Sequence, residues 1–168
     1  MTEPVSSDSQ LPEGRFVGRQ AFVGLVRQAI VCAAREGWPS LLLSDADFAD
    51  WPLGERAVVE ALNAWAGRGR QLRLLAQDYG PVRLQHPRFV QWRVTWSHLV
   101  EAQVWSGATA GELPSAIWSP GWTLERLDPL RCAGVSNCDG VRRVALRERL
   151  DAAWHRGGPG FAATVLGL

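Results

Sequence analysis

Residues 40–77 decide the fold, and they read SLLLSDADFADWPLGERAVVEALNAWAGRGRQLRLLAQ. Residues 40–44 (SLLLS) and 71–77 (QLRLLAQ) are short apolar runs between Gly and Pro residues, which is typical of buried strands. A helix is predicted between them, from the end of residues 52–54 (PLG) to about Ala66. A strand, a helix and a strand at this spacing predict a right-handed βαβ unit with parallel strands.

The segments on either side extend this unit into a larger sheet. Upstream, apolar side chains recur with helical spacing from Phe22 to Ala33, and Gly37 and Pro39 end that helix. Downstream, Ser119-Pro120-Gly121 is a strong turn signal between two apolar runs and predicts a hairpin. The other downstream elements are predicted as a helix over 89–97, strands over 99–105, 115–118, 122–127 and 131–136, and a helix over 141–155.

The sequence therefore predicts one α/β domain. Its layered sheet has a parallel start and a late antiparallel hairpin, with helices on both faces. Residues 1–14 are poor in apolar side chains and are predicted to be a flexible tail, so the domain covers 15–168. The Gly-rich apolar segment 157–168 is expected to pack back onto the body.

The composition excludes several classes of function. The chain has 168 residues, 46% hydrophobic and 21% charged, which is typical of a globular domain. A net charge of +1 provides no broad electrostatic surface for nucleic acid or an anionic membrane. The 18 basic residues are all arginine, so mechanisms that need a lysine amine are excluded.

The start of the chain and the cysteines predict a cytoplasmic protein. The first ten residues, MTEPVSSDSQ, do not have the pattern of a signal peptide. Polar residues interrupt the longest apolar run, near 94–104, so no membrane segment is predicted. The three widely spaced cysteines are expected to be reduced thiols.

Asp45 and Asp47 directly follow the first predicted strand of the βαβ unit. Ligands in open α/β sheets bind at the carboxyl ends of strands, so the position suits a site. The Asp-x-Asp spacing resembles the nucleophile motif of haloacid-dehalogenase-like phosphatases, which hold Mg²⁺. Ala49 stands where that family needs Thr or Val, and late acidic residues are isolated. Asp45 and Asp47 are therefore metal candidates, and exposed loop residues are the alternative. No other cofactor is predicted.

His86-Pro87-Arg88 is comparable with the phospholipase D motif, His-x-Lys followed after four residues by Asp. Arg88 stands at the Lys position and Arg93 at the Asp position, and no other histidine begins a copy of the motif. The nucleophilic histidine of such a site needs an acidic partner to set its tautomer. Only the cationic part is available here.

The order of the elements nevertheless resembles one half of a phospholipase D-like domain, over about residues 15–165. The resemblance rests on residues 18–35 (GRQAFVGLVRQAIVCAAR), 41–47 (LLLSDAD), 67–78 (GRGRQLRLLAQD), 86–98 (HPRFVQWRVTWSH) and 151–161 (DAAWHRGGPGF). The chain is similar to proteobacterial proteins that keep this fold without the catalytic motif. The resemblance implies no catalytic residue, because none matches.

Two groups of side chains are candidates for binding. The anion-binding candidates are His86, Arg88, Arg93 and His98, which could surround a phosphate or carboxylate. The alternative for them is a surface helix with its tryptophan face buried. The interface candidates are Trp92, Trp96, Trp118 and Trp122, because tryptophan and arginine are enriched at interface hot spots.

Three functions remain open from the sequence. The favoured one is a non-catalytic domain that binds a protein partner or a small anion. The first alternative is a phosphoryl-handling hydrolase that uses Asp45 and Asp47 with Mg²⁺, or His86 with Arg88 and Arg93. The second alternative is weak nucleic-acid binding through arginines, which the net charge makes unfavourable. The oligomeric state is left open, and no membrane partner is expected.

Overall fold

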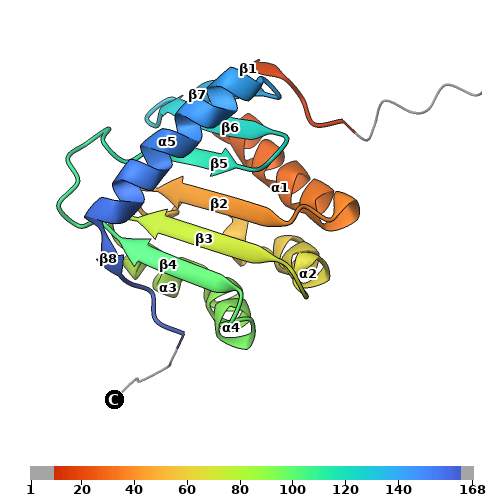
Figure 1. The fold of residues 1–168 in the computed structure, drawn as a ribbon, viewed down its shortest axis with the longest axis vertical. Helices are drawn as coiled ribbons and strands as arrows, with labels where there is room; N and C mark the ends of the chain where they lie inside the picture. Colours follow the sequence, from red (N-terminus) through yellow and green to blue (C-terminus); the bar gives the residue numbers. More distant parts are fainter. Residues whose placement is uncertain (1–9, 164–168) are drawn as a thin grey trace, which may run out of the picture.

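A mixed sheet crosses the molecule and carries helices on both faces (Figure 1). The computed structural model describes residues 10–163. The elements are β1 (Gly14–Phe16), α1 (Arg19–Glu36), β2 (Ser40–Asp45), the short 3₁₀ helix η2 (Pro52–Gly54), α2 (Arg56–Trp65), β3 (Gln71–Ala76), α3 (Gly80–Gln85), α4 (Pro87–Thr95), β4 (Val100–Val104), β5 (Ser115–Trp118), β6 (Thr123–Asp128), β7 (Ala133–Asn137), α5 (Gly140–Arg156) and β8 (Gly158–Pro159). The strand order is β1-β7-β6-β5-β2-β3-β4-β8.

The parallel start and the late hairpin are both confirmed. β2 pairs in parallel with β3, and β3 with β4, so the carboxyl ends of these three strands lie at one edge. β5 pairs antiparallel with β2 and β6, and Ser119 closes the β5–β6 turn by hydrogen bonding to Trp122. Gly and Pro at the tip let the chain reverse there, as the turn signal predicted.

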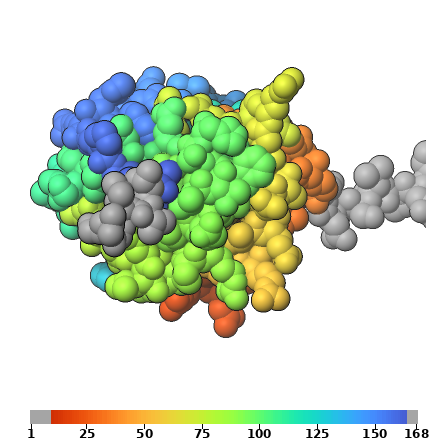
Figure 2. Space-filling model, turned by 90° about the horizontal axis from the view of Figure 1, so that it is seen from below, coloured from red at the N-terminus to blue at the C-terminus, as the bar shows by residue number. Residues whose placement is uncertain are grey.

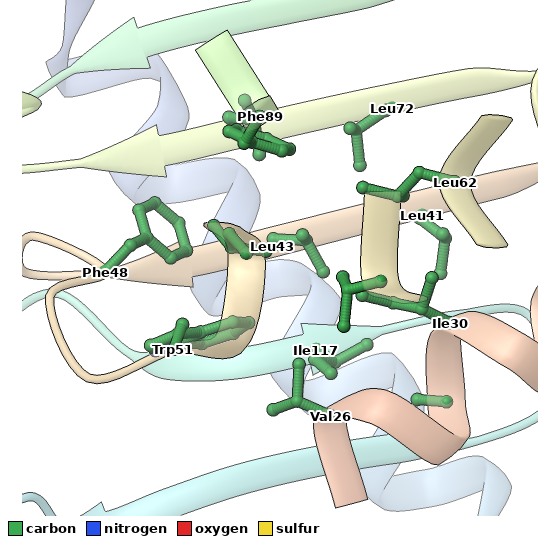
Figure 3. Close-up of a cluster of buried hydrophobic side chains, with 14 of the residues drawn as sticks. Val26, Ile30, Leu41, Leu43, Phe48, Trp51, Leu62, Leu72, Phe89 and Ile117 are labelled. Atoms are coloured by element: carbon green, nitrogen blue, oxygen red, sulfur yellow. The ribbon is translucent and has the colours of Figure 1, made fainter. Parts of the chain in front are cut away.

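Alternating side chains of β2 serve two cores. Leu41 and Leu43 belong to the larger core, under α1, α2 and α4, which Figure 3 shows in close-up. Leu42 points to the opposite face, where it packs with Leu146 and Leu150 of α5. The run is apolar throughout because both faces of the strand are covered. The predicted helices on both faces are therefore confirmed.

The sequence patterns do not predict four of these elements, which are β1, η2, α3 and β8. Tyr79 directly precedes the short helix α3, and Pro81 lies in its first turn. Proline is tolerated there because the first amides of a helix need no intrahelical acceptor. Val144 of α5 is 57% exposed. The buried stripe of α5 consists of Leu146, Leu150 and Ala153, and Val144 is off that stripe.

The packed part of the chain begins earlier than residue 15. The Pro12 carbonyl accepts hydrogen bonds from Trp122 Nε1 at 3.1 Å and from Ser136 Oγ at 2.8 Å. Gly14 then pairs with Ser136 in the sheet. Residues 12–14 of the predicted tail are therefore bound to the body, and residues 1–9 lie outside the described range. No helix in residues 10–163 is long and apolar enough to cross a membrane.

Candidate functional site

The four predicted anion-binding side chains do not meet in one pocket. His86 is buried, and its Nε2 lies 2.9 Å from the carbonyl oxygen of Phe48. Arg88 is exposed and donates to the carbonyl oxygen of Gly54 at 3.1 Å. Both side chains therefore hold the loop after β2 against the start of α4.

Arg93 and His98 lie elsewhere. Arg93 is only 7% exposed and has its guanidinium 6.0 Å from the centre of the Phe161 ring. His98 is exposed beside the ring of Trp96, with 5.8 Å between their centres. The four residues lie within 13 positions of the sequence. Their side chains nevertheless point to different surroundings, because they lie at the start, in the last turn and beyond the end of α4.

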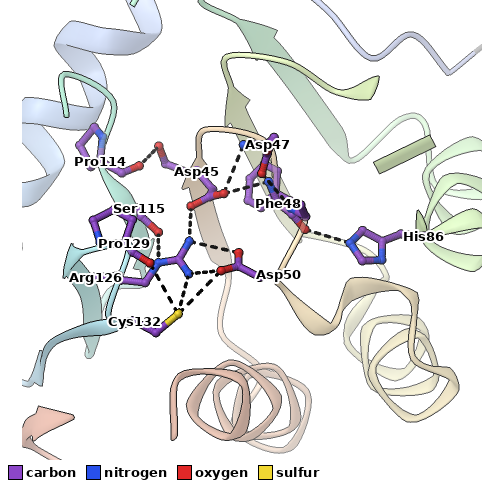
Figure 4. Close-up of polar contacts among 12 residues, drawn as sticks. Asp45, Asp47, Phe48, Asp50, His86, Pro114, Ser115, Arg126, Pro129 and Cys132 are labelled. Atoms are coloured by element: carbon purple, nitrogen blue, oxygen red, sulfur yellow. Dashed lines mark hydrogen bonds and ion pairs between the residues drawn. The ribbon is translucent and has the colours of Figure 1, made fainter. Parts of the chain in front are cut away.

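Asp45, one of the two metal candidates, is buried at the end of β2 and is already paired (Figure 4). Its Oδ1 lies 2.9 Å from Arg126, and its Oδ2 accepts the amides of Asp47 at 3.2 Å and Phe48 at 2.8 Å. Asp47 accepts the amide of Ala49 at 3.0 Å. Among residues 10–163, no group of three His, Cys, Asp or Glu side chains could hold a metal ion. The guanidinium of Arg126 therefore occupies the position beside Asp45 that a metal ion would need.

Arg126 of β6 is the centre of a buried ion cluster that the sequence did not reveal. Its side chain is 3% exposed and contacts Asp45, Asp50 and Ser115, whose Oγ is 3.1 Å away. Burial alone would lower the pKa of Arg126, but the hydrogen bond to Asp50 and the charges of both aspartates raise it above its ordinary value. Burial would raise the pKa of Asp50, and Arg126 instead lowers it. Both shifts favour the charged forms of Arg126 and Asp50, and the contacts of Arg126 fix the loop after β2 to β6.

A hollow of about 810 Å³ opens at the carboxyl ends of the parallel strands, where ligands of open α/β sheets bind. We call it the strand-end hollow. Its lining combines aromatic, cationic, acidic and amide groups. The lining residues are Ala46, Asp47, Gln77, Asp78, Tyr79, Gly80, Arg83, Val104, Ser106, Gly160 and Phe161.

Two stacked aromatic rings form part of this lining. Tyr79 and Phe161 lie with their ring centres 4.9 Å apart and an interplanar angle of 10°. The Tyr79 hydroxyl donates to the carbonyl oxygen of Gln103 at 2.9 Å, and burial raises its pKa. The Tyr79 ring is therefore held in place from both its backbone and its hydroxyl group.

Two guanidinium groups flank the rings. Arg83 lies 5.3 Å from the centre of the Phe161 ring and reaches the rim of the hollow. Arg93 is buried beside Phe161, its Nε has no acceptor in the described part of the chain, and burial lowers its pKa. Neither arginine forms an ion pair with a described carboxylate. A buried cation without an anionic partner is costly, which makes Arg93 a candidate group for an anionic ligand. Arg83 is exposed and lines the hollow, so it can also contact such a ligand.

The carboxylates of the hollow are partly occupied by their own loops. Asp78 accepts the amide of Gly80 at 2.8 Å, as Asp47 does with Ala49. The side-chain amide of Gln77 donates to the carbonyl oxygen of Ala108 at 2.8 Å. Among the described residues, no histidine or cysteine lines the hollow.

A second hollow, of about 680 Å³, lies between the start of α1 and the loop before α2. We call it the α1 hollow. Its Arg27 forms a two-bond ion pair with Glu55, at 2.6 and 2.7 Å. Its Asp50 is held by Arg126. These charges are neutralised within the protein, which leaves Arg19 as a candidate ligand group there.

The four interface tryptophans do not form one exposed surface. Trp92 and Trp122 are buried, at 4% and 2% exposure. Trp96 and Trp118 are half-buried, and their indole N–H groups donate to Asn63 and to the carbonyl oxygen of Arg143. Packing within the domain therefore accounts for all four, and a protein partner stays a prediction.

Comparison with known proteins extends this description. No protein-family model matches the chain, and no curated protein matches it. The archaeal chromatin protein TrmBL2, whose structure is described as showing a novel mode of DNA binding, aligns with a TM-score of 0.67 at 12% identity. The alignment covers 93% of this chain and 57% of that one, so this chain spans little more than half of TrmBL2.

NucT from Helicobacter pylori aligns with a TM-score of 0.54 at 6% identity, over 89% of this chain and 99% of that one. At such low identities the likeness concerns the fold. NucT has the phospholipase D-like fold that the order of elements in this sequence resembles. The chain is a mixed α/β domain with a phospholipase D-like fold.

Proposed function

We propose that this chain is a non-catalytic domain that binds one nucleotide, free or as a unit of a single strand, in the strand-end hollow. The observation that carries the proposal is the stacked pair Tyr79 and Phe161 beside two guanidinium groups without carboxylate partners.

The chemistry of the hollow matches the parts of a nucleotide. Aromatic side chains stack on bases in a sequence-tolerant way. Arg83 and Arg93 present the planar donor groups that suit phosphate. The free lone pairs of Asp47 and Asp78 can accept hydrogen bonds from the N–H groups of a base.

The arrangement of the reactive groups favours binding over hydrolysis. A nucleophile needs a base within hydrogen-bonding distance. The Nε2 of His86 faces a backbone carbonyl, and Asp45 is paired with Arg126. The lysine that the phospholipase D motif needs is missing from the whole chain. Neither set of residues expected for a hydrolase is therefore assembled at the hollow.

The structural neighbours and the net charge together narrow the class of ligand. TrmBL2 is described as a DNA-binding protein, and NucT is a nuclease of the phospholipase D superfamily, which supports a ligand related to nucleic acid. The net charge of +1 disfavours contact with many phosphates. One nucleotide with its phosphate at Arg83 meets both conditions. The logarithm of the affinity for a single strand should then fall with the logarithm of salt concentration with a slope of about −0.7.

Substitution of Arg83 tests the proposal. In Arg83→Ala, we expect binding of uridine monophosphate and of a labelled oligothymidylate of about 12 nucleotides to weaken roughly ten-fold, because a charge-assisted hydrogen bond is lost. Fluorescence anisotropy and competition at about 50 mM salt measure both ligands. Competition by the free nucleotide indicates a mononucleotide site, and binding of the oligonucleotide alone indicates a unit of a strand.

Arg68→Ala is the matched control. Arg68 is exposed before β3, at the end of the sheet opposite the hollow, and the substitution removes the same charge. Its affinity should stay within about two-fold of the parent, because it has no part in phosphate binding. No binding of either ligand to the parent protein, or equal losses in the two variants, would refute the proposed function.

A further inference from the structure

The segment that follows α5 returns across the edge of the sheet to the strand-end hollow. We call residues 157–161 the C-terminal strap. Gly158 pairs with Val104 of β4, and the amide of Gly160 donates to the carbonyl oxygen of Ala102 at 3.3 Å. Figure 1 shows β8 beside β4 at the edge of the sheet, and Figure 2 shows blue C-terminal residues beside green ones on the surface. The strap therefore adds the two-residue edge strand β8 to the sheet beside β4.

Two glycines let the strap lie close to Val104. A Cβ on Gly157 would lie 2.8 Å from the carbonyl oxygen of Val104, and a Cβ on Gly160 would lie 2.8 Å from the Val104 side chain. A side chain at either position would push the strap away from β4. Glycine at these two positions therefore allows the strap to pack against β4.

The strap carries Phe161 into the aromatic part of the hollow. Its ring is 4% exposed, is stacked on Tyr79, and lies parallel to Phe89 at 6.2 Å. The backbone of Phe161 has φ = 51°, a conformation that side-chain-bearing residues rarely adopt. Strained residues of this kind concentrate at ligand clamps and switch regions.

With the strap packed against β4, the guanidinium of Arg93 has no anionic partner in the described part of the chain. Arg93 lies against the Phe161 ring, and its buried Nε has no acceptor in the described part of the chain. Arg83 also faces this ring and meets no described carboxylate. An aromatic ring thus sits where two cations converge, and a ring with a phosphate attached would satisfy them better.

We propose that Phe161 occupies the position in which a pyrimidine base stacks on Tyr79, so that the strap is an internal competitor that must leave β4 before the base binds. A pyrimidine has one six-membered ring, the same footprint as the ring of Phe161. This inference rests on the proposed function. The apparent affinity equals the intrinsic one multiplied by the fraction of molecules with the strap open.

The test compares Phe161→Ala with the parent protein by titration with uridine monophosphate and adenosine monophosphate. Removal of the competing ring should tighten uridine monophosphate binding about ten-fold, because burial of that ring no longer favours the closed strap. Adenosine monophosphate should gain less, because its larger base exceeds the space that the ring vacates. Leu84→Ala is the control: Leu84 is 85% exposed beside Arg83, and its loss should leave the affinity unchanged.

Gly160→Ala is the second variant and keeps the aromatic ring. Its added Cβ displaces the strap from Val104, so uridine monophosphate should again bind more tightly than to the parent.

Circular dichroism of each variant establishes whether it is folded. Unchanged or weaker nucleotide binding in folded Phe161→Ala and Gly160→Ala overturns the strap inference, while Arg83-dependent binding to the parent keeps the proposed function. No nucleotide binding to any variant overturns both. Binding of a Gly-Pro-Gly-Phe peptide in place of nucleotide makes the hollow a peptide groove and also overturns the inference.

Discussion

Arg126→Met should lower the free energy of unfolding by about 3–5 kcal/mol, the cost of breaking a buried ion pair from one side. Arg126 is 3% exposed in its side chain and is the cationic partner of the equally buried Asp45 and of Asp50. Methionine fills a similar volume but leaves the Asp45 carboxylate buried without a positive charge. Urea denaturation followed by tryptophan fluorescence measures the change.

Two further variants separate charge from packing. Arg131→Met replaces an arginine whose side chain is 82% exposed and whose ion pair with Asp128 spans 3.9 Å. Its effect should stay below about 0.5 kcal/mol, as for most surface pairs. Adding Asp45→Asn to Arg126→Met should recover part of the loss, because the unpaired charge is removed. A loss below about 1 kcal/mol in Arg126→Met would show that the cluster is solvated and not a buried pair.

Gly134→Ala should destabilise the domain by about 3 kcal/mol, at the upper end of the usual cost of overpacking. Gly134 lies in β7 and pairs with Phe16 on one side and Arg126 on the other. An added Cβ would overlap the carbonyl oxygen of Glu125 and come within 2.8 Å of the Arg126 Cα. Backbone atoms paired on both sides cannot move away without loss of ladder hydrogen bonds.

Gly121→Ala is the control for this substitution. Gly121 lies in the β5–β6 turn, and a Cβ there would meet no atom within 4 Å. Its unfolding free energy should change by less than about 1 kcal/mol, since only turn conformation is affected. Thermal and urea unfolding of the two variants side by side provide the measurement. Equal effects at the two positions would contradict the close approach of β6 to β7.

The βαβ unit and the β5–β6 hairpin could be predicted because local patterns specify them. Leu41 to Leu43 form a continuous apolar run, and Pro120 and Gly121 mark a turn, wherever the rest of the chain lies. The edge strands β1 and β8 have three and two residues, and α3 has six, so none is long enough to show a period. Their position depends on the strands and helices that they pack against.

The candidate site could be located only in part. Of the two metal candidates at the carboxyl end of β2, Asp47 lines the strand-end hollow, whereas Asp45 is paired with Arg126. Arg126 pairs with Asp45 across 81 positions of sequence, and Phe161 reaches Tyr79 through the return of the strap. Nothing local distinguishes either residue from other arginines and phenylalanines. The His and Arg residues of 86–98 are prominent in the sequence, but the structure separates their side chains in space.

Nucleotide binding at the strand-end hollow is tested most directly by amide ¹H–¹⁵N chemical shifts, with uridine monophosphate titrated to millimolar concentration. The largest shifts are expected to cluster at the strand-end hollow, in residues 77–83, 104–106 and 158–161. The residues of the α1 hollow, 19–27 and 50–55, should be unaffected. Shifts confined to the α1 hollow, or none at either hollow, would contradict the claim that the strand-end hollow binds a nucleotide.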